Sequence, residues 1–241
     1  MNGLSKNTKA RASSLDVFVF ELVHEREDHA VYEQLAVANL ARQYDFLRSL
    51  IQASLQLERP MIGLEVVKAL NYHAISCLHA HAGELRPCQV YVNDYTPPAH
   101  HRVPALMAIL IDDLNRWWDR HDPIYLAAYV LWRLNWVHPF INGNGRTARV
   151  TAYYIICLSL GGWLPGEMLL PDLLRRDRDE YVAALKVADA SIAAGPIDLS
   201  ILHGLLQRLL EEQLAPFTSA EAATQISGQA VQADGEEPPG S

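Results

Sequence analysis

Apolar side chains recur every three or four residues along most of the chain, the spacing that gives a helix one buried face. Segment 122–136 is apolar almost all round, so we expect that helix to lie buried at the centre of the fold. The spacing predicts helices at 29–57, 61–81, 103–118, 122–136, 146–160, 173–190 and 196–214. The sequence therefore predicts an all-α fold.

Residues with strong positional preferences stand at the ends of two of these helices. Asp122 and Pro123 are a capping residue followed by a favoured first helical residue. Gly161 and Gly162 follow segment 146–160 and are typical of a helix stop. These signals place one helix on each side of the loop between residues 136 and 146.

Segment 86–95 departs from the helical pattern and predicts the fold's one short β-hairpin. Val90 and Val92 alternate with a tyrosine, and Asn93 and Asp94 are typical turn residues. Such a hairpin can dock a partner segment as an added strand. An ordinary surface hairpin without a binding role is the alternative.

The distribution of apolar residues divides the chain into four parts. Residues 1–13 are predicted to form a flexible tail, 14–60 an N-terminal helical region and 61–214 the main domain. Within the second part, segment 15–23 suits a strand as well as a helix. Residues 215–241 are poor in large apolar side chains and are expected to be disordered.

Composition narrows the classes of partner. A formal net charge of −8 argues against nucleic acid or an anionic membrane surface as the main partner. No segment is long and apolar enough to suggest a membrane span. Three cysteines without a CxxC pair are typical of a reducing compartment. We therefore expect a cytoplasmic protein. Secretion by a machinery that needs no cleaved signal is left open as an alternative.

The loop between the two central helices carries the strongest chemical signal. Residues 138–149 read HPFINGNGRTAR. Gly143, Asn144 and Gly145 tolerate unusual backbone angles, so successive N–H groups can turn inward and form an anion nest. A helix N-terminus at the same place favours phosphate.

Charged and titratable residues extend this signal. Arg146 and Arg149 lie in the first helical turn, where a cation is unfavourable unless an anion neutralises it. His138 is the group in the loop that can act as a base near neutral pH. A turn, a loop histidine and a solvated arginine pair are each common alone. The glycine-rich loop, the histidine and the two arginines occur together in one short segment, and this combination predicts phosphoryl or nucleotidyl transfer to a hydroxyl.

Residues 138–149 resemble the signature of the Fic (Fido-domain) proteins, which reads HPF, any residue, Asp or Glu, then GNGRxxR. The resemblance spans roughly 62–210 and includes the sequence AGELR at 82–86. It implies a Fic/Fido-like helical domain with a short hairpin flap. It also implies transfer of AMP from ATP to a Ser, Thr or Tyr hydroxyl of a target protein; transfer of another phosphate-linked group is the alternative.

The resemblance also assigns roles to residues. His138 would be the general base, and a helix near the C-terminus would supply a nucleotide-contacting tyrosine at Tyr181 and a polar residue at Asp189. A core tyrosine is the equal alternative for Tyr181, and a solvated surface residue is the preferred interpretation of Asp189. The remaining implied groups are the phosphate-binding residues Gly143, Asn144, Gly145, Arg146 and Arg149, and the target-docking flap residues Val90, Tyr91 and Val92.

One departure from the signature concerns the metal. Asn142 stands where the family has an acidic ligand for Mg²⁺ or Mn²⁺, and a neutral amide is a weaker ligand for such cations. Slower catalysis, a changed metal or donor preference, and a nucleotide-binding pseudoenzyme or regulator all stay open. We favour retained activity. Besides an enzyme and a nucleotide-binding regulator, a third class of function is a helical interaction protein that binds no nucleotide.

Regulation is only weakly indicated. Many Fic proteins carry an inhibitory helix with Ser or Thr, three residues, Glu, then Gly or Asn. The match in this chain runs from Ser54 to Glu58 but continues with Arg59, so an ordinary surface glutamate is the better interpretation. A separate inhibitor chain is left open, and the sequence does not indicate the oligomeric state.

Overall fold

The computed structural model describes residues 30–92, 95–193 and 195–233, with side chains between residues 32 and 217. The expected N-terminal tail and the ambiguous segment 15–23 lie outside the described residues, as do Asn93 and Asp94.

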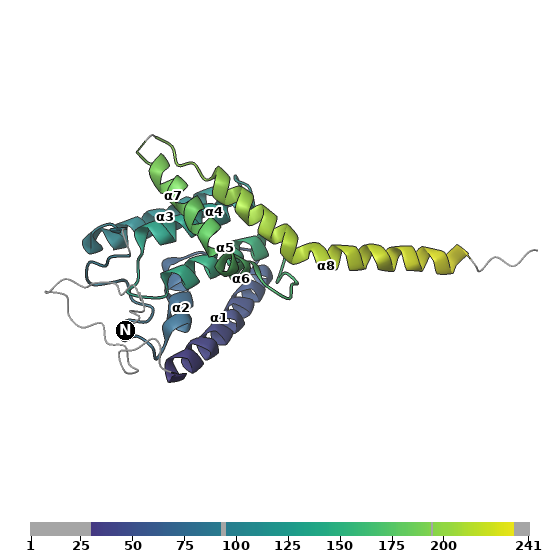
Figure 1. The fold of residues 1–241 in the computed structure, drawn as a ribbon, viewed down its shortest axis with the longest axis horizontal. Helices are drawn as coiled ribbons and strands as arrows, with labels where there is room; N and C mark the ends of the chain where they lie inside the picture. The colour runs from purple at the N-terminus through teal and green to yellow at the C-terminus, as the bar shows by residue number, and fades with distance from the viewer. Residues whose placement is uncertain (1–29, 93–94, 194, 234–241) are drawn as a thin grey trace, which may run out of the picture.

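Helices make up the regular structure of these described segments, so the predicted all-α class is confirmed (Figure 1). They are α1 (Ala30–Gln56), α2 (Leu64–Ile75), the 3₁₀ helix η1 (His100–Arg102), α3 (Val103–Trp117), α4 (Pro123–Val137), α5 (Asn144–Ser159), α6 (Leu170–Arg176), α7 (Arg178–Ser191) and α8 (Ser200–Ala233).

Helices α4 and α5 form the centre of the fold. They pack against each other, with α1 and α2 on one side of the pair and α7 and α8 on the other (Figure 1). Trp132, Tyr153 and Tyr154 are among the largest fully buried side chains. The expected central, buried position of segment 122–136 is therefore confirmed.

The two helix-end signals act as predicted. The carboxylate of Asp122 accepts a hydrogen bond from the backbone N–H of Tyr125 at 2.9 Å, and Pro123 is the first residue of α4. Helix α5 ends at Ser159, and Gly161 follows with a positive φ of 82°. Such a φ suits glycine, which has no Cβ to clash with its own backbone.

Polar side chains of α1 tie that helix to α2. Asn39 donates to the carbonyl of Ser76 at 2.8 Å, and Gln43 donates to the carbonyl of Leu70 at 2.8 Å. The Asn39 and Gln43 side chains are fully buried. Because a buried polar group is costly without a partner, these bonds fix α1 in one position against α2.

Two of the expected helices differ in extent. The helix expected at 61–81 ends at Ile75, because Cys77 has a positive φ of 61° and the chain turns there. The helix expected at 173–190 is instead two helices, α6 and α7, which meet at Asp177. Apolar spacing continues through both breaks, so it does not reveal them.

The expected hairpin at 86–95 is represented, among the described residues, by one isolated antiparallel bridge. Val92 and Tyr95 exchange backbone hydrogen bonds of 2.9 and 2.8 Å. Just before this bridge, the backbone N–H of Arg86 donates to the carbonyl of Pro139 at 2.8 Å. The segment is thus held by the 138–149 loop rather than by a partner strand.

Helix α8 is longer than expected and projects away from the rest of the molecule (Figure 1). We expected disorder from residue 215 on, whereas the helix continues to Ala233 and includes Pro216. The segment is rich in Ala and Gln, which favour helices. A lack of large apolar residues argues against a packed core, not against a helix.

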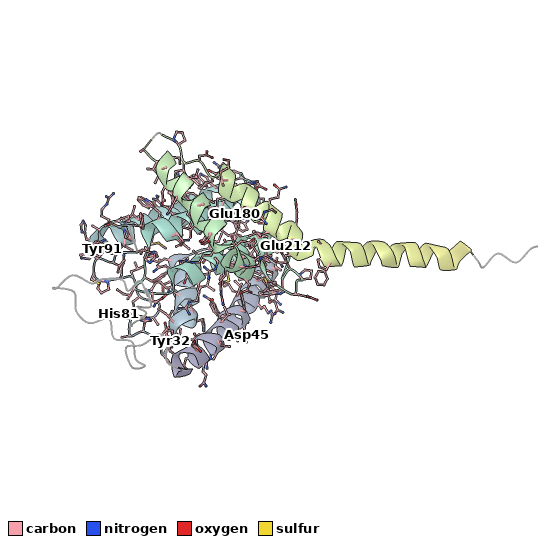
Figure 2. The ribbon with its side chains drawn as sticks, viewed as in Figure 1. Tyr32, Asp45, His81, Tyr91, Glu180 and Glu212 are labelled. Carbon is pink, nitrogen blue, oxygen red and sulfur yellow. The ribbon has the colours of Figure 1, made fainter. Side chains whose placement is uncertain are left out.

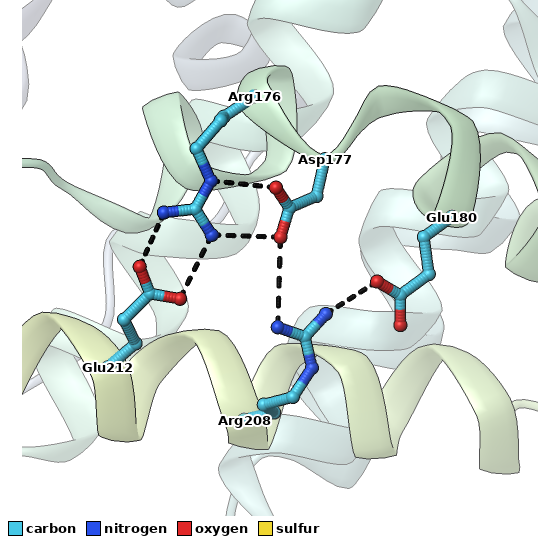
Figure 3. Close-up of polar contacts among 5 residues, drawn as sticks. All are labelled: Arg176, Asp177, Glu180, Arg208 and Glu212. Atoms are coloured by element: carbon cyan, nitrogen blue, oxygen red, sulfur yellow. Dashed lines mark hydrogen bonds and ion pairs between the residues drawn. The ribbon is translucent and has the colours of Figure 1, made fainter.

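A network of exposed charged side chains joins the body of α8 to α6 and α7 (Figure 3). Arg176 binds both Asp177 and Glu212, and Arg208 donates to Glu180 at 2.6 Å. Exposed ion pairs contribute little to stability. We interpret this network as fixing the direction of α8 rather than as a main source of stability.

Candidate active site

His138 ends the central helix α4. Its backbone N–H still donates to the carbonyl of Leu134 at 3.0 Å, but its φ of 50° and ψ of 61° are left-handed. This conformation is uncommon for a residue with a side chain. The turn at His138 separates α4 from the loop that leads into α5.

The side chain of Arg86 holds this turn in place. Its Nε donates to the carbonyl of His138 at 2.8 Å, its Nη1 donates to the carbonyl of Cys88 at 2.8 Å, and its Nη2 donates to the carbonyl of Pro98. Only 2% of Arg86 is exposed. One buried guanidinium therefore links the loop that carries His138 to the segment around the flap.

The side chain of Asn144 closes the loop from within. Its Oδ1 accepts from the backbone N–H of Phe140 at 2.9 Å, and its Nδ2 donates to the Phe140 carbonyl at 2.8 Å. Both residues are buried. The amide of Asn144 thus has a structural role, and only its backbone N–H is left for the predicted phosphate contact.

Gly143 occupies a position that no other residue fits without displacing its neighbours. Its φ is 76°, and an added Cβ would lie 2.9 Å from Asn71 Nδ2 and 2.9 Å from Ile75 Cγ2. Its backbone N–H donates to Asn142 Oδ1 at 2.5 Å. The predicted nest therefore needs correction, because the Gly143 N–H is already bonded within the loop.

The first turn of α5 provides the anion site instead. No side chain caps this N-terminus. Backbone N–H groups in a first helical turn have no partner within the helix, so those of Asn144 and Gly145 can bind phosphate oxygens. A Cβ on Gly145 would lie 3.2 Å from Arg149 Nη1. The Arg149 guanidinium therefore reaches back to the same helix end.

The two motif arginines have different surroundings. Arg146 donates from Nη1 to the carbonyl of Ala74 on α2 at 2.9 Å. Burial lowers the pKa of Arg149, with the Tyr181 and Tyr44 hydroxyls acting in the opposite direction. In the described part of the chain, no carboxylate lies within ion-pair distance of Arg149. A buried cation in that position is suited to an anionic ligand.

A cavity of about 490 Å³ lies beside these arginines, between α1, α5 and α6. Its polar and charged lining residues are Glu33, Gln43, Tyr44, Arg146, Arg149, Asp172 and Arg175. Glu58, the weak inhibitory candidate, does not line it; Glu58 lies exposed beyond the end of α1. The structure thus does not bring Glu58 together with the motif arginines.

The surroundings of His138 keep its imidazole neutral at physiological pH. Burial lowers the pKa of His138 to about 4, a hydrogen bond to the Asn135 backbone acts in the opposite direction, and Arg86 lowers it further. A carbonyl accepts from one ring N–H, so the other ring nitrogen keeps its lone pair. His138 can therefore act as a base throughout the neutral range.

The residues around Asn142 do not fit a divalent cation. Asn142 Oδ1 accepts from Gly143, and Asn142 Nδ2 lies 2.7 Å from His79 Nε2. His79 is 4% exposed, and burial, with Arg146 and His81 adding to the effect, lowers its pKa to about 4. No cluster of three His, Cys, Asp or Glu side chains within the described segments could hold a metal. We therefore derive no step through Mg²⁺ or Mn²⁺.

Tyr181 and Asp189 both lie in contacts with α4. Tyr181 is buried, its hydroxyl accepts from Asn135 Nδ2 at 2.8 Å, and burial raises its pKa to about 12. Asp189 accepts from the indole N–H of Trp132 at 2.9 Å, and burial raises its pKa. Tyr181 is thus a core residue near Arg149, and the preferred interpretation of Asp189 as solvated surface is wrong.

The three flap residues are not equivalent. Val90 is 3% exposed and packs with Cys88 and Ile141, so its side chain is not available to a target. Tyr91 is 41% exposed and lies at the edge of the molecule beside the start of α3 (Figure 2). Val92 is half-buried. Any target docking here involves the backbone and Tyr91 rather than Val90.

Three residues that shape the site were not singled out from the sequence. Arg86 belongs to the AGELR segment but received no role, and His79 received none either. Asn71 bonds to the Asn142 carbonyl at 2.9 Å and to Thr147 Oγ1 at 3.2 Å. A polar residue on the predicted buried face of 61–81 was the available signal for Asn71.

Two histidines with lowered pKa values, the buried His79 and the half-buried His138, predict acid sensitivity. His79 and His138 each have a folded-state pKa of about 4 against an ordinary value of 6.5, so below pH 6.5 the unfolded chain binds more protons. The free energy of unfolding should be constant above pH 6.5 and fall toward pH 4, by up to roughly 3 kcal/mol for each group. Urea unfolding at pH 7.5, 6.5 and 5.5 measures this decline.

A matched pair of variants shows whether His79 contributes to this fall in the free energy of unfolding. His79→Gln removes one of the two groups and should flatten the decline, whereas His101→Gln, at an exposed position, should leave it unchanged. Equal stability of the native chain at pH 7.5 and 5.5 would contradict the prediction.

None of the described helices is long and apolar enough to cross a membrane.

Comparisons with known proteins agree with the geometry of the loop. Residues 62–156 match the family model described as Fic/DOC family. The protein adenylyltransferase fic-1 of Caenorhabditis briggsae is 41% identical over 112 residues, which cover 45% of this chain and 20% of that protein. The protein adenylyltransferase Fic of Drosophila persimilis is 26% identical over 193 residues, which cover 78% and 34%. The chain thus spans about a third or less of the length of these curated relatives.

Solved structures show the same fold. Fic-1 of Caenorhabditis elegans, residues 134–508, has a TM-score of 0.65 at 26% identity and covers 83% of this chain and 55% of that one. A Fic family protein of Desulfovibrio desulfuricans has a TM-score of 0.60 at 20% identity, with coverage of 80% and 55%. Residues 62–156 therefore match the Fic/DOC family, and the chain has the fold of the Fic proteins.

Proposed function

We propose that this protein transfers AMP from ATP to the hydroxyl of a Ser, Thr or Tyr side chain on a target protein. Relatives named protein adenylyltransferase support the reaction class. The observation that carries the proposal is a neutral histidine at one end of a short loop whose other end is an uncapped helix N-terminus beside Arg149.

In this reaction His138 takes the proton of the target hydroxyl while the hydroxyl oxygen attacks the α-phosphorus of ATP. A new P–O bond to the target forms, the bond from the α-phosphorus to the bridging oxygen breaks, and pyrophosphate leaves. The anion site at the start of α5 holds the phosphate oxygens. Arg146 and Arg149 neutralise the charge that develops on the pyrophosphate.

The target segment binds along the flap in this proposal. Val90 anchors the flap to the core, while the exposed ring of Tyr91 and the adjacent backbone face outward. Main-chain docking selects an extended segment but constrains its side chains weakly. The flap therefore brings a hydroxyl to His138 without fixing the target sequence.

The test incubates the chain and a protein extract with ATP that carries ³²P in either the α- or the γ-phosphate. α-³²P should become covalently attached to protein, while γ-³²P should not, because the γ-phosphate leaves with pyrophosphate. Intact-mass analysis of the labelled protein should show an adenylate-sized addition. Attachment of the γ-label would indicate phosphate transfer, and an adduct of another mass would indicate a different donor.

A nucleotide-binding regulator without turnover is the second candidate, because Asn142 replaces the acidic residue of the signature and pairs with His79. Asn142→Asp separates the two functions. If the native chain incorporates no α-label and Asn142→Asp does, the native protein is the regulator. If both incorporate the label, the native chain is the enzyme.

A further inference from the structure

The cavity between α1, α5 and α6 contains one more arginine than the motif supplies. Arg146 and Arg149 come from α5, and Arg175 comes from the last turn of α6. Nothing in the signature predicts Arg175. Its position is consistent with the lowering of the Arg149 pKa, to which both Arg146 and Arg175 contribute after burial.

These positive charges are only partly balanced by nearby carboxylates. Asp172 accepts a hydrogen bond from the Tyr44 hydroxyl at 3.1 Å, and Glu33 is exposed on α1. Within the described residues, neither carboxylate lies at ion-pair distance from Arg149 or Arg175. Arg149 and Arg175 thus repel each other, and an anion in the cavity would offset that repulsion.

One atom of Gln43, in the cavity wall, has no hydrogen-bond partner among the described residues. Gln43 is fully buried and donates from Nε2 to Leu70, but its Oε1 has no hydrogen-bond partner. An unsatisfied buried acceptor is costly, and a bound water or a ligand hydroxyl would satisfy it. The cavity therefore has the features of a site that is filled in the working protein.

The cavity is continuous with the phosphate-binding end of α5. The guanidinium of Arg149 lies against Gly145 at the helix N-terminus and also lines the cavity. A nucleotide whose inner phosphates bind that N-terminus would extend its terminal phosphates toward Arg149 and the exposed Arg175.

The metal site of the signature offers no comparable charge. Asn142 is neutral, and both ends of its amide are bonded to Gly143 and His79. An ammonium or guanidinium group can neutralise phosphate charge in the place of a cation.

We propose that Arg175 binds the terminal phosphates of the nucleotide together with Arg146 and Arg149, and that this trio makes nucleotide binding independent of a divalent cation. The proposal rests on the assignment of a nucleoside triphosphate as the donor. It names a specificity residue on α6, outside the motif: Arg175 distinguishes the triphosphate from the monophosphate.

The test is calorimetric titration of the full chain with ATP and with AMP, in EDTA and in Mg²⁺. ATP should bind in EDTA within about threefold of its affinity in Mg²⁺. Arg175→Ala should weaken ATP binding by about tenfold, as expected for loss of one charge-assisted contact. AMP binding should not change, because AMP lacks the terminal phosphates.

Matched variants distinguish a local contact from general charge. Arg178→Ala removes an exposed arginine on α7 that does not line the cavity and should leave ATP binding unchanged. Arg175→Lys, which keeps the charge, should recover part of the affinity. Glu33→Gln removes a negative charge from the cavity wall and should strengthen ATP binding. Circular dichroism checks that each variant is folded.

Two results would overturn the proposal: loss of ATP binding in EDTA, or equal effects of Arg175→Ala and Arg178→Ala. These outcomes are separate from the fate of the proposed function. ATP binding with the expected pattern but without label transfer would support the site and reject the transferase.

Discussion

His138→Ala should lower the rate of AMP transfer by about 10²- to 10⁴-fold, the usual contribution of a positioned general base. The loss should be confined to the chemical step, because His138 has no part in the anion site at the start of α5. ATP affinity should therefore change by no more than about twofold. Initial rates with α-labelled ATP and calorimetric binding measure the two quantities separately.

The pH dependence of the native rate carries the same information. A base with a pKa of about 4 is unprotonated at all pH values well above 4. Transfer by the native chain should thus not fall between pH 7.5 and 5.5 through titration of His138. A step in the rate with a midpoint near the ordinary histidine value of 6.5 would contradict the neutral imidazole of this structure.

A histidine elsewhere on the surface provides the control. His101→Ala, at an exposed position in η1, should leave both the rate and ATP binding unchanged. If His138→Ala weakened ATP binding as much as transfer, His138 would have a structural role and the proposed base would have to be sought elsewhere.

Arg86→Ala should destabilise the fold by about 3 kcal/mol or more, because each of three carbonyls left without its donor costs about 1–3 kcal/mol. Truncation would leave the carbonyls of His138, Cys88 and Pro98 without the donor that now satisfies them. The expected result is a lower midpoint of urea unfolding with an unchanged slope. Surviving folded protein should also lose transfer activity, because the turn at His138 loses its anchor.

Two further variants make the Arg86 result specific. Arg86→Lys should be nearly as destabilising, since one ammonium group cannot donate in three directions as the planar guanidinium does. Arg102→Ala, at an exposed position in η1, should change stability by less than about 0.5 kcal/mol. Full stability of Arg86→Lys would show that charge rather than geometry holds the loop.

Local sequence signals predicted the fold class and the position of the loop, because both depend on residues close together in the chain. The cap at Asp122, the apolar helix after it and the glycines of the loop all act over a few residues. A phosphate-binding helix N-terminus at this loop could also be predicted, since the glycines and arginines lie within residues 143–149.

Contacts between distant segments could not be predicted in this way. Arg86 reaches the carbonyl of His138, and Asn71 reaches the carbonyl of Asn142, only because α2 and the flap segment fold against the loop. The cavity needs α1, α5 and α6 together. Alternation around Tyr91 indicated a hairpin, but tertiary bonds from Arg86 decided the backbone there.

The site roles implied by the Fic resemblance also depend on contacts that the sequence does not show. The signature fixes which residues occupy the loop, not which atoms they use. The side-chain amide of Asn144 is hydrogen-bonded to the backbone of Phe140, and the N–H of Gly143 donates to the side chain of Asn142. Tyr181 lies in the core, where a hydrogen bond from Asn135 satisfies its hydroxyl. Side-chain bonding of this kind appears only once the loop is closed.

The cavity wall has a consequence for how donor choice can diverge within the family. Residues of α1 and α6 contribute Gln43, Glu33 and Arg175, all of which lie outside the segment 62–156 that matches the family model. The catalytic loop lies inside that segment. Evolution can therefore alter the cavity that we propose for the donor's terminal phosphates while the diagnostic signature stays the same, so shared signatures do not guarantee shared donors.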